Sequence, residues 1–260
     1  MPKTVDKKAA AGIRQFYAGR GFLPVWTVDG KITDHGKAII ARIAEAEADG
    51  LDPAAFKAPS ADIGNTSPAS LADLATAEVM LSTAAVTYAR QAYAGRLVPG
   101  EVSPNIGWVA KEVDSEAVLS SVTTSDDPAV TLADYNPQQK EFILLRGKLA
   151  EFRAAKAEKK EHVEIPAGPL LKPGMTDARI VLLRKRFDLP TDVPNADVYD
   201  ETVVAAVEAF QKSQKIKADG LIGKGTIAAI NKRDPDPVPL ILANMERWRW
   251  MPRSLGNFYV

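Results

Sequence analysis

The stretch Asp219-Gly-Leu-Ile-Gly-Lys-Gly-Thr226 decides how the last part of this chain folds. Gly220 permits a positive φ, and the aspartate before it can accept hydrogen bonds from the amides that follow, so the stretch predicts a turn. Gly223 then opens a helix in which Ile227 and Ile230 face one side. The turn therefore leads into the last helix of a small module.

Two further helices are predicted upstream of this turn. The first follows Gly174-Met-Thr176, and the second can be capped by Asp200, whose side chain can accept from the first amides of the helix. Their inward positions recur at steps of three and four residues: Ile180, Leu183 and Phe187, then Val203, Val207 and Phe210. Three short helices would then bury one core in about 60 residues, near the lower size at which a domain folds alone.

Several residues of this module carry a resemblance to a known family. They are Gly174, Leu183, Tyr199-Asp-Glu-Thr202, Ala205-Ala-Val207, Phe210-Gln211 and the turn at 219–226. Together they resemble the three-helix peptidoglycan-binding domain of bacterial cell-wall enzymes, for which Phe-Gln followed by Asp-Gly-x-x-Gly-x-x-Thr is distinctive. The resemblance implies that residues 170–232 form this domain and that its partner is peptidoglycan, through glycan strands and stem peptides.

Because the core residues of the module report its fold, a binding surface has to come from exposed polar and aromatic groups beside the helices. Arg184, Tyr199, Gln211 and Asp219 are the candidates. A shallow groove with an arginine, a tyrosine and amide donors suits glycan hydroxyls and acetamides, and stem-peptide carboxylates. The alternative interpretation is that each of the four is a neutral surface residue.

The first half of the chain is predicted to be largely helical. Helices are indicated over 5–17, from Thr33 to Asp49, after Asp52-Pro53, from Leu71 to Ala92 and from Asn136-Pro137 onward, with an irregular stretch over 100–125. The helix after Asn136-Pro137 carries a narrow packing seam of Phe142, Leu145, Leu149 and Phe152, and the helix that starts at Leu71 carries an apolar stripe of Leu71, Leu74, Leu81, Ala85, Tyr88 and Ala92. Glu78 falls on that stripe. It is either a tuned acid or, more commonly, a structural carboxylate, for which Arg90 and Arg96 are the expected partners.

A charged, alanine-rich segment from Ala154 to Glu161 and the stretch Pro166-Ala-Gly-Pro169 mark a domain boundary. The sequence thus predicts a mainly α fold, with a helical scaffold domain followed by the three-helix domain. The expected boundaries are 1–160 for the scaffold, 161–169 for a linker, 170–232 for the peptidoglycan-binding domain and 233–260 for a C-terminal segment.

Three other stretches of the sequence carry a resemblance to a more specific family. They are Ile13-Arg-Gln-Phe-Tyr-Ala-Gly-Arg-Gly-Phe-Leu-Pro-Val-Trp26, Asp49-Gly-Leu-Asp-Pro53 and Tyr93-Ala-Gly-Arg-Leu-Val-Pro99. They are similar to the scaffold domain of large periplasmic L,D-transpeptidases of Gram-negative bacteria. In that family the scaffold leads into a peptidoglycan-binding domain and then, through a junction similar to Asn244-Met-Glu-Arg-Trp-Arg-Trp-Met-Pro252, into a catalytic domain.

The same resemblance implies the chemistry of such a catalytic domain. A cysteine thiolate, activated by a histidine, forms an acyl-enzyme and passes the acyl group to an amine, which gives 3-3 crosslinks in peptidoglycan. This chain has no cysteine, and His35 and His162 stand outside the family's His-Gly-Cys-Arg context. We therefore assign no catalytic residue and expect no transpeptidation by this chain alone.

Composition excludes several other classes of function. Lys+Arg and Asp+Glu both total 33, so no field of one sign indicates a nucleic-acid partner. No stretch approaches the roughly 18 apolar residues of a membrane span. Without cysteine, and with two isolated histidines, the sequence predicts no metal site and no cofactor. The resemblance implies a periplasmic location, with a secretory leader absent from this chain.

The stretch from Ile241 to Arg253 predicts an amphipathic helix closed by Pro252, and Asn257-Phe-Tyr-Val260 reads as the first residues of a strand. We expect this segment to lead into a catalytic domain outside the chain. Trp248 and Trp250 would then be an uncovered packing face, and the segment would be poorly packed in isolation.

Three alternatives remain open. The chain could be a stand-alone cell-wall-binding or adaptor protein with no catalytic half. It could be a lytic glycosidase that uses paired carboxylates such as Glu78 and Asp114, although no spacing argument brings these two together. It could also be a helical interaction module that docks a partner through Trp248 and Trp250.

Overall fold

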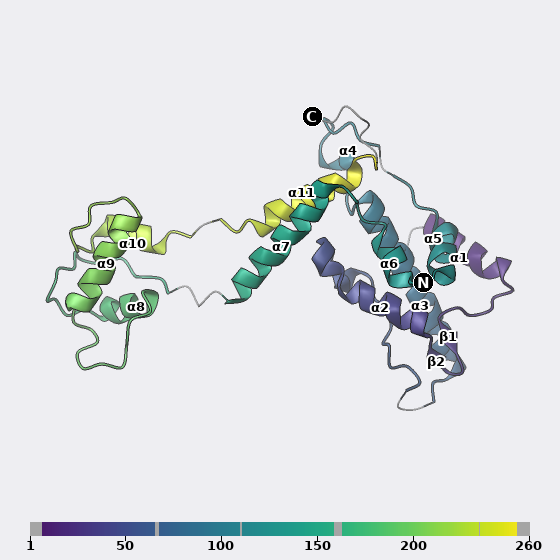
Figure 1. Cartoon of the computed structure of the whole chain (residues 1–260), viewed down its shortest axis with the longest axis horizontal. Helices are drawn as coiled ribbons and strands as arrows, with labels where there is room; N and C mark the ends of the chain where they lie inside the picture. Colours follow the sequence, from purple (N-terminus) through teal and green to yellow (C-terminus); the bar gives the residue numbers. More distant parts are fainter. Residues whose placement is uncertain (1–6, 66–67, 110, 159–162, 234, 254–260) are drawn as a thin grey trace. The chain divides into compact units, whose positions relative to one another are not determined.

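The computed structural model describes residues 7–65, 68–109, 111–158, 163–233 and 235–253 (Figure 1). The fold is mainly α, as the sequence predicts, with one two-stranded sheet among the described residues. The chain divides into two compact units. Unit 1 combines Met1–Lys156 with Pro237–Val260, and unit 2 is Ala157–Asp236. Unit 2 is therefore an insertion into the sequence of unit 1.

Unit 1 is built around one long central helix. Its elements are α1 (Lys7–Gly19), β1 (Thr27–Val28), β2 (Lys31–Ile32), α2 (Asp34–Ala44), η1 (Ala46–Asp49), η2 (Pro53–Ala55), α3 (Leu71–Ala94), α4 (Pro99–Val102), α5 (Ser115–Thr124), α6 (Pro128–Ala133), α7 (Lys140–Glu158) and α11 (Val238–Trp250). Helices α1, α2, α5, α6 and α11 all contact α3. The core that they enclose includes Trp26, Tyr88 and Leu119. β1 and β2 form a short antiparallel hairpin.

The predicted stripe along α3 is correct except at its start. Leu81, Ala85, Tyr88 and Ala92 are fully buried, but Leu71 is 87% exposed because the first turns of α3 extend beyond the helices that cover the rest of it. The stretch over 100–125 is not wholly irregular, since it contains α4 and α5. The sequence signal that was missed is the side chain of Asp114, which accepts from the first amides of α5.

Helix α11 belongs to unit 1 and is well packed there. Met245 and Arg249 are fully buried and Trp250 is nearly so, while Trp248 is half-buried. The expectation of an uncovered, poorly packed tryptophan face is therefore wrong for this helix. The physical reason is that α7 and α3 provide the partner surface within the chain itself. The strand expected over 257–260 lies outside the described residues.

Helices α7 and α11 lie side by side, as Figure 1 shows. Their shared core consists of Phe142, Leu149, Ile241 and Met245. This pairing confirms the part of the predicted α7 seam made by Phe142 and Leu149. Phe152, the last residue of that seam, is 41% exposed. Because α7 ends where unit 2 begins and α11 starts where unit 2 ends, the two helices carry both connections to the inserted unit.

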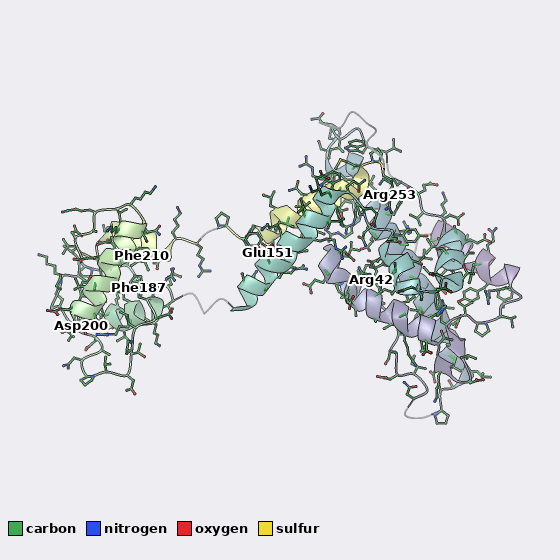
Figure 2. All side chains as sticks on the ribbon, in the orientation of Figure 1. Arg42, Glu151, Phe187, Asp200, Phe210 and Arg253 are labelled. Carbon is green, nitrogen blue, oxygen red and sulfur yellow. The ribbon has the colours of Figure 1, made fainter. Side chains whose placement is uncertain are left out.

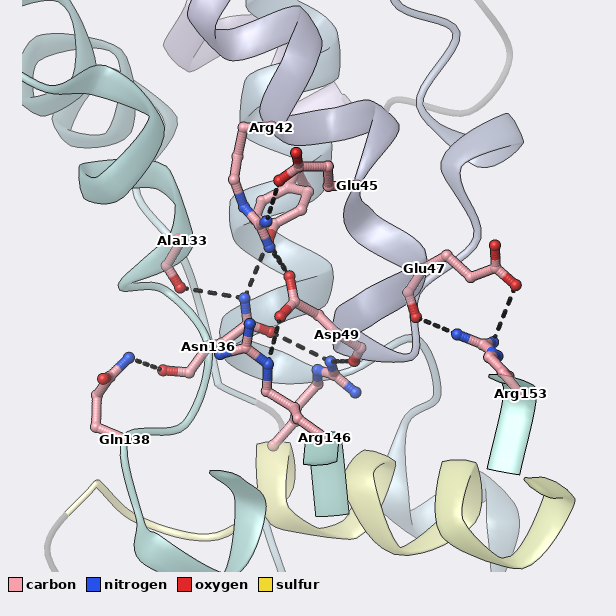
Figure 3. Close-up of polar contacts among 11 residues, drawn as sticks. Arg42, Glu45, Glu47, Asp49, Ala133, Asn136, Gln138, Arg146 and Arg153 are labelled. Atoms are coloured by element: carbon pink, nitrogen blue, oxygen red, sulfur yellow. Dashed lines mark hydrogen bonds and ion pairs between the residues drawn. The ribbon is translucent and has the colours of Figure 1, made fainter. Parts of the chain in front are cut away.

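A buried polar group, here called the Asp49 cluster, ties α11 to the other helices of unit 1 (Figure 3). Its members are Arg42, Asp49, Tyr88, Asn136, Arg146 and Arg249. The Asp49 carboxylate pairs with Arg42, pairs with Arg146 at 3.0 Å and accepts from the Tyr88 hydroxyl at 2.7 Å. Arg249 donates to the Asp49 carbonyl and, at 3.2 Å, to Asn136.

Unit 2 has the three predicted helices, α8 (Ala178–Arg186), α9 (Glu201–Ser213) and α10 (Lys224–Asn231). Asp177 caps α8 and Asp200 caps α9, each by accepting from a first-turn amide. Two isolated bridges, Leu171 with Ile222 and Thr176 with Val198, hold the connecting segments together. The core of unit 2 includes Leu183, Tyr199, Val207 and Ile230. Figure 2 shows Phe187 beside Phe210, whose ring centroids lie 5.6 Å apart.

Candidate functional site

The turn at 219–226 is held from inside unit 2 by Gln211. Its amide nitrogen donates to the Leu221 carbonyl at 3.0 Å, and its amide oxygen accepts from the Gly220 amide at 3.0 Å. Gly220 has the predicted positive φ of 66°. Gln211 is 1% exposed, so the expectation that it is a surface group is wrong. The buried Gln211 amide thus forms hydrogen bonds with backbone groups of the turn that water does not reach, as a neighbouring strand would do in a sheet.

Tyr199 is also interior. Its ring is 1% exposed, and its hydroxyl donates to the Gly220 carbonyl at 2.7 Å. Burial raises the pKa of Tyr199 above its ordinary value, with the negative charges of Glu208 and Asp219 adding to the effect. The hydroxyl therefore stays protonated and remains a donor to the turn. The expectation that Tyr199 is exposed is wrong for its ring, although the residue is among those that line a groove of unit 2.

Arg184 is 2% exposed and joins two parts of unit 2. It donates to the Ala196 carbonyl at 2.9 Å and pairs with Asp200, the residue that caps α9. The Val203 amide, and after it Arg184, lowers the pKa of Asp200, so this carboxylate is ionised at neutral pH. Arg184 is therefore occupied by internal acceptors, and the expectation that it is exposed is wrong.

Asp219 is half-buried in the turn itself. It accepts from the Leu221 amide at 3.0 Å and lies 3.3 Å from the Lys217 ammonium. The Leu221 amide is the main cause that lowers the pKa of Asp219. The structure thus brings Tyr199, Gln211 and Asp219 together around one turn, whereas Arg184 lies on α8 and pairs with Asp200 at the start of α9. Their shared role in the structure is to hold unit 2 in shape.

A shallow groove of about 490 Å³ lies on the outside of unit 2, beside α9. The segments before α8 and α9 form one side of it, and the helix forms the other; among its lining residues are Pro173, Gly174, Asp200, Glu201, Ala205 and Glu208. The Asp200 side chain is 44% exposed even though it pairs with Arg184. Tyr199 also lines this groove, so one of the four residues predicted from the sequence belongs to it. The lining residues on the outer face of α9 were not predicted, because the apolar pattern of the sequence carries no signal there.

The groove offers acceptors. Asp200, Glu201 and Glu208 present carboxylate oxygens, which accept hydrogen bonds from hydroxyls, amides and ammonium groups. Glycan strands carry hydroxyl and acetamide N–H donors, and stem peptides carry amide and amino donors. The groove thus complements the donor groups of such a polymer, whereas the arginine expected from the sequence would have complemented its carboxylates.

Neither carboxylate of the glycosidase hypothesis is available for acid–base chemistry. Glu78 accepts from the Tyr17 hydroxyl at 2.8 Å, from the amides of Val25 and Trp26, and from the Thr27 hydroxyl at 3.0 Å. It is a structural carboxylate, but its partners are these groups and not Arg90 or Arg96. Asp114 caps α5. Both side chains are committed to hydrogen bonds that hold the fold.

Within the described ranges, no group of three or more His, Asp or Glu side chains is placed to hold a metal ion. Among the helices that the structure describes, none is both long and apolar enough to cross a bilayer.

Two family models match the chain. One, described as "Scaffold domain", matches residues 11–149, and the other, described as "Putative peptidoglycan binding domain", matches residues 174–230. The second match covers α8, α9, α10 and the groove beside α9. A comparison with curated proteins gives no match.

Proposed function

The chain belongs to the scaffold-domain family and carries a peptidoglycan-binding domain, and on this basis we propose that unit 2 holds peptidoglycan in the groove beside α9. The match over 174–230 is the observation that carries the proposal, because it supports peptidoglycan as the partner of unit 2 and an association with the cell wall. The groove supports it with a row of carboxylate acceptors at the surface, where a large polymer can reach them.

A bulky residue inside the groove tests this assignment. Ala205 lines the groove and is exposed, so Ala205→Trp should obstruct it while leaving the core of unit 2 unchanged. Ala209 is exposed on the same helix and does not line the groove, which makes Ala209→Trp a matched control. In co-sedimentation with insoluble sacculi, we expect Ala205→Trp to lower the bound fraction at least about fivefold and Ala209→Trp to leave it unchanged. Equal binding by the two variants would contradict the assignment.

The proposal extends to the parent protein. The stretches at 13–26, 49–53, 93–99 and 244–252 resemble the scaffold and junction of large periplasmic L,D-transpeptidases, and the two matched domains follow in the same order. On this view, the chain is the non-catalytic portion that positions such an enzyme on peptidoglycan in the periplasm. The catalytic domain is then its third partner, after glycan strands and stem peptides.

Two tests separate this proposal from the alternative of a stand-alone cell-wall adaptor. An open reading frame that continues past Val260 into a His-Gly-Cys-Arg motif supports the transpeptidase parent, and a stop codon at that point supports the adaptor. The purified chain, which has no cysteine, should form no 3-3 crosslinks from muropeptide donors. Crosslinked products detected by mass spectrometry would overturn the non-catalytic assignment.

A further inference from the structure

An apolar groove of unit 1 has no part in the function proposed above. It measures about 730 Å³ and lies between α1 and the first turns of α3, with the β1–β2 hairpin along one side. Among its lining residues, Phe22 is 69% exposed and Leu71 is 87% exposed. Val28 and Val79 are also exposed and also line the groove, so several uncovered apolar side chains meet there and make it a candidate docking surface.

The pattern along α3 indicates the shape of the occupant. Leu71, Ala75 and Val79 are exposed at steps of four residues, which places them on one face of the helix, and all three line the groove. Such a row is the ridge against which another helix packs. It extends over about 12 Å at 1.5 Å per residue, so a helix of about three turns would cover it.

The backbone at Phe22 supports the same interpretation. Phe22 has a positive φ of 62°, which is rare for a bulky residue and costs on the order of 1 kcal/mol. This conformation does not bury the ring, because Phe22 is exposed at the groove. The chain thus holds the Phe22 ring at the surface with an unfavourable backbone conformation, although the ring is not part of the hydrophobic core.

The charges of the groove favour a polypeptide over a lipid. Arg14 and Asp29 both line it, are both exposed and, among the described residues, have no ion-pair partner. They come from different elements, α1 and the hairpin turn, and have opposite signs. An anionic lipid surface would be attracted by Arg14 and repelled by Asp29, whereas a helix with Glu and Lys beside its apolar face satisfies both.

We propose that this groove is a docking site for an amphipathic helix of a partner protein. The apolar face of that helix, with side chains at steps of three and four residues, would pack on Leu71, Ala75 and Val79. A carboxylate beside that face would meet Arg14, and a basic side chain would meet Asp29. The floor of the groove is pre-formed, since Glu78 beneath it is held by Tyr17 and by the amides of Val25 and Trp26.

The test uses the full chain and a fluorescent peptide of about 15 residues, with leucines at steps of three and four, glutamates on one flank and lysines on the other. Val79→Asp and Leu71→Asp place charge in the groove at positions that the core does not use. Fluorescence anisotropy should show at least about tenfold weaker binding for both variants. Val130→Asp, at an exposed valine of α6 away from the groove, is the matched control and should bind as the original chain does.

A double-mutant cycle examines the charge contact. Replacing the glutamates of the peptide by glutamine should weaken its binding to the original chain several-fold and leave its binding to Arg14→Gln unchanged. Three results would overturn the proposal: no binding of the peptide, binding that Val79→Asp does not weaken, or an additive cycle. Sedimentation with phosphatidylglycerol vesicles that Val79→Asp abolishes would assign the groove to a lipid surface, and a concentration-dependent dimer that Val79→Asp disrupts would assign it to a second copy. Either result also contradicts a partner helix.

Discussion

Asp49 carries the buried negative charge that compensates the arginines paired with it in unit 1. Its side chain is 1% exposed and is the common acceptor for two arginines and a tyrosine (Figure 3). Buried ionised groups are stable only when they are paired and hydrogen-bonded. Arg42, at 9% exposure, has little access to water that could replace its partner.

We therefore predict that Asp49→Asn destabilises the chain by about 3 kcal/mol, because it leaves buried arginine charge without compensation. Urea unfolding followed by circular dichroism measures the change. Asp126→Asn is the control, since Asp126 is exposed and has no ion-pair partner among the described residues. Equal midpoints for the two variants would show that the Asp49 cluster contributes nothing to stability.

Lys111 gives a prediction about pH. Its ammonium lies 4.8 Å from the Tyr93 ring centroid, and Arg253 lies 5.0 Å from the same ring. Burial, and after it repulsion from Arg253, lowers the pKa of Lys111 from 10.5 to about 8. Because the folded chain binds this proton less tightly than the unfolded chain, stability should rise between about pH 8 and pH 10.5. Below about pH 8 the ammonium is charged in both states, and no further change is expected.

Urea midpoints of the original chain and of Lys111→Gln, compared across this range, isolate the contribution of Lys111. The difference between the two should change with pH above about 8 and be constant below it. An NMR titration of the Lys111 side chain checks the pKa directly. A midpoint near the ordinary lysine value would contradict the account of this site.

For single residues, the sequence predicts well the roles that depend on nearby positions in the chain, and poorly the roles that depend on distant positions. Asp200 was recognised as a helix cap, because a cap depends on the next three residues. For Gln211 the sequence predicts a surface position, because its partner amide at Gly220 is nine residues away and reaches it only through a turn. Glu78 accepts from groups more than fifty residues distant, which no spacing along the chain reveals.

At the scale of elements, α11 is held by a contact with the end of α3. Glu246 accepts from the amides of Arg96 and Leu97, which follow that helix. The backbone passes close to α11 at Gly95, where φ is 88°. A Cβ at Gly95 would lie 2.7 Å from the Glu246 carboxylate and 2.8 Å from the Trp250 indole nitrogen. Glycine is therefore required here for both conformation and space.

Gly95→Ala should destabilise unit 1 by about 1–3 kcal/mol, because it combines backbone strain with a close contact at α11. Gly147→Ala in α7 is the matched control. Nothing lies within 4 Å of a Cβ there, and alanine favours a helix over glycine. The midpoint of thermal unfolding should therefore be lower for Gly95→Ala than for the original chain, and equal or higher for Gly147→Ala. A neutral Gly95→Ala would contradict the close docking of α11.

The elements themselves were largely predictable from the sequence, whereas their packing was not. The three helices of unit 2 follow from apolar steps within 8 to 13 residues, and α8 and α9 also from their caps. Helix α11 was also predicted, but its packing against α3 and α7 was missed. The contact of Arg249 with Asp49 joins residues 200 positions apart, and the apolar face of α11 fits an external domain as well as it fits α7.

At the scale of the whole molecule, the chain is one compact unit interrupted by another. Unit 2 leaves after α7 and returns before α11, and these two helices pack side by side. Each unit has its own core, so neither needs the other for burial of its apolar residues. Inserted domains of this kind are tolerated when their two ends meet the host at neighbouring positions.

Excision of unit 2 tests this architecture and the peptidoglycan assignment together. Residues 157–236 are replaced by a short Gly/Ser linker, which should leave unit 1 folded, with cooperative unfolding and protected amides in α11. The linker length follows from the side-by-side packing of α7 and α11. Loss of amide protection in α11 would show that unit 1 requires the inserted unit.

Co-sedimentation of the full chain and of the excised chain with insoluble sacculi is the most direct measurement of the central claim. The full chain should pellet with the sacculi, while the excised chain should remain in the supernatant although it is folded. If the excised chain pellets as fully as the intact one, unit 2 is not what holds peptidoglycan, and the account is contradicted.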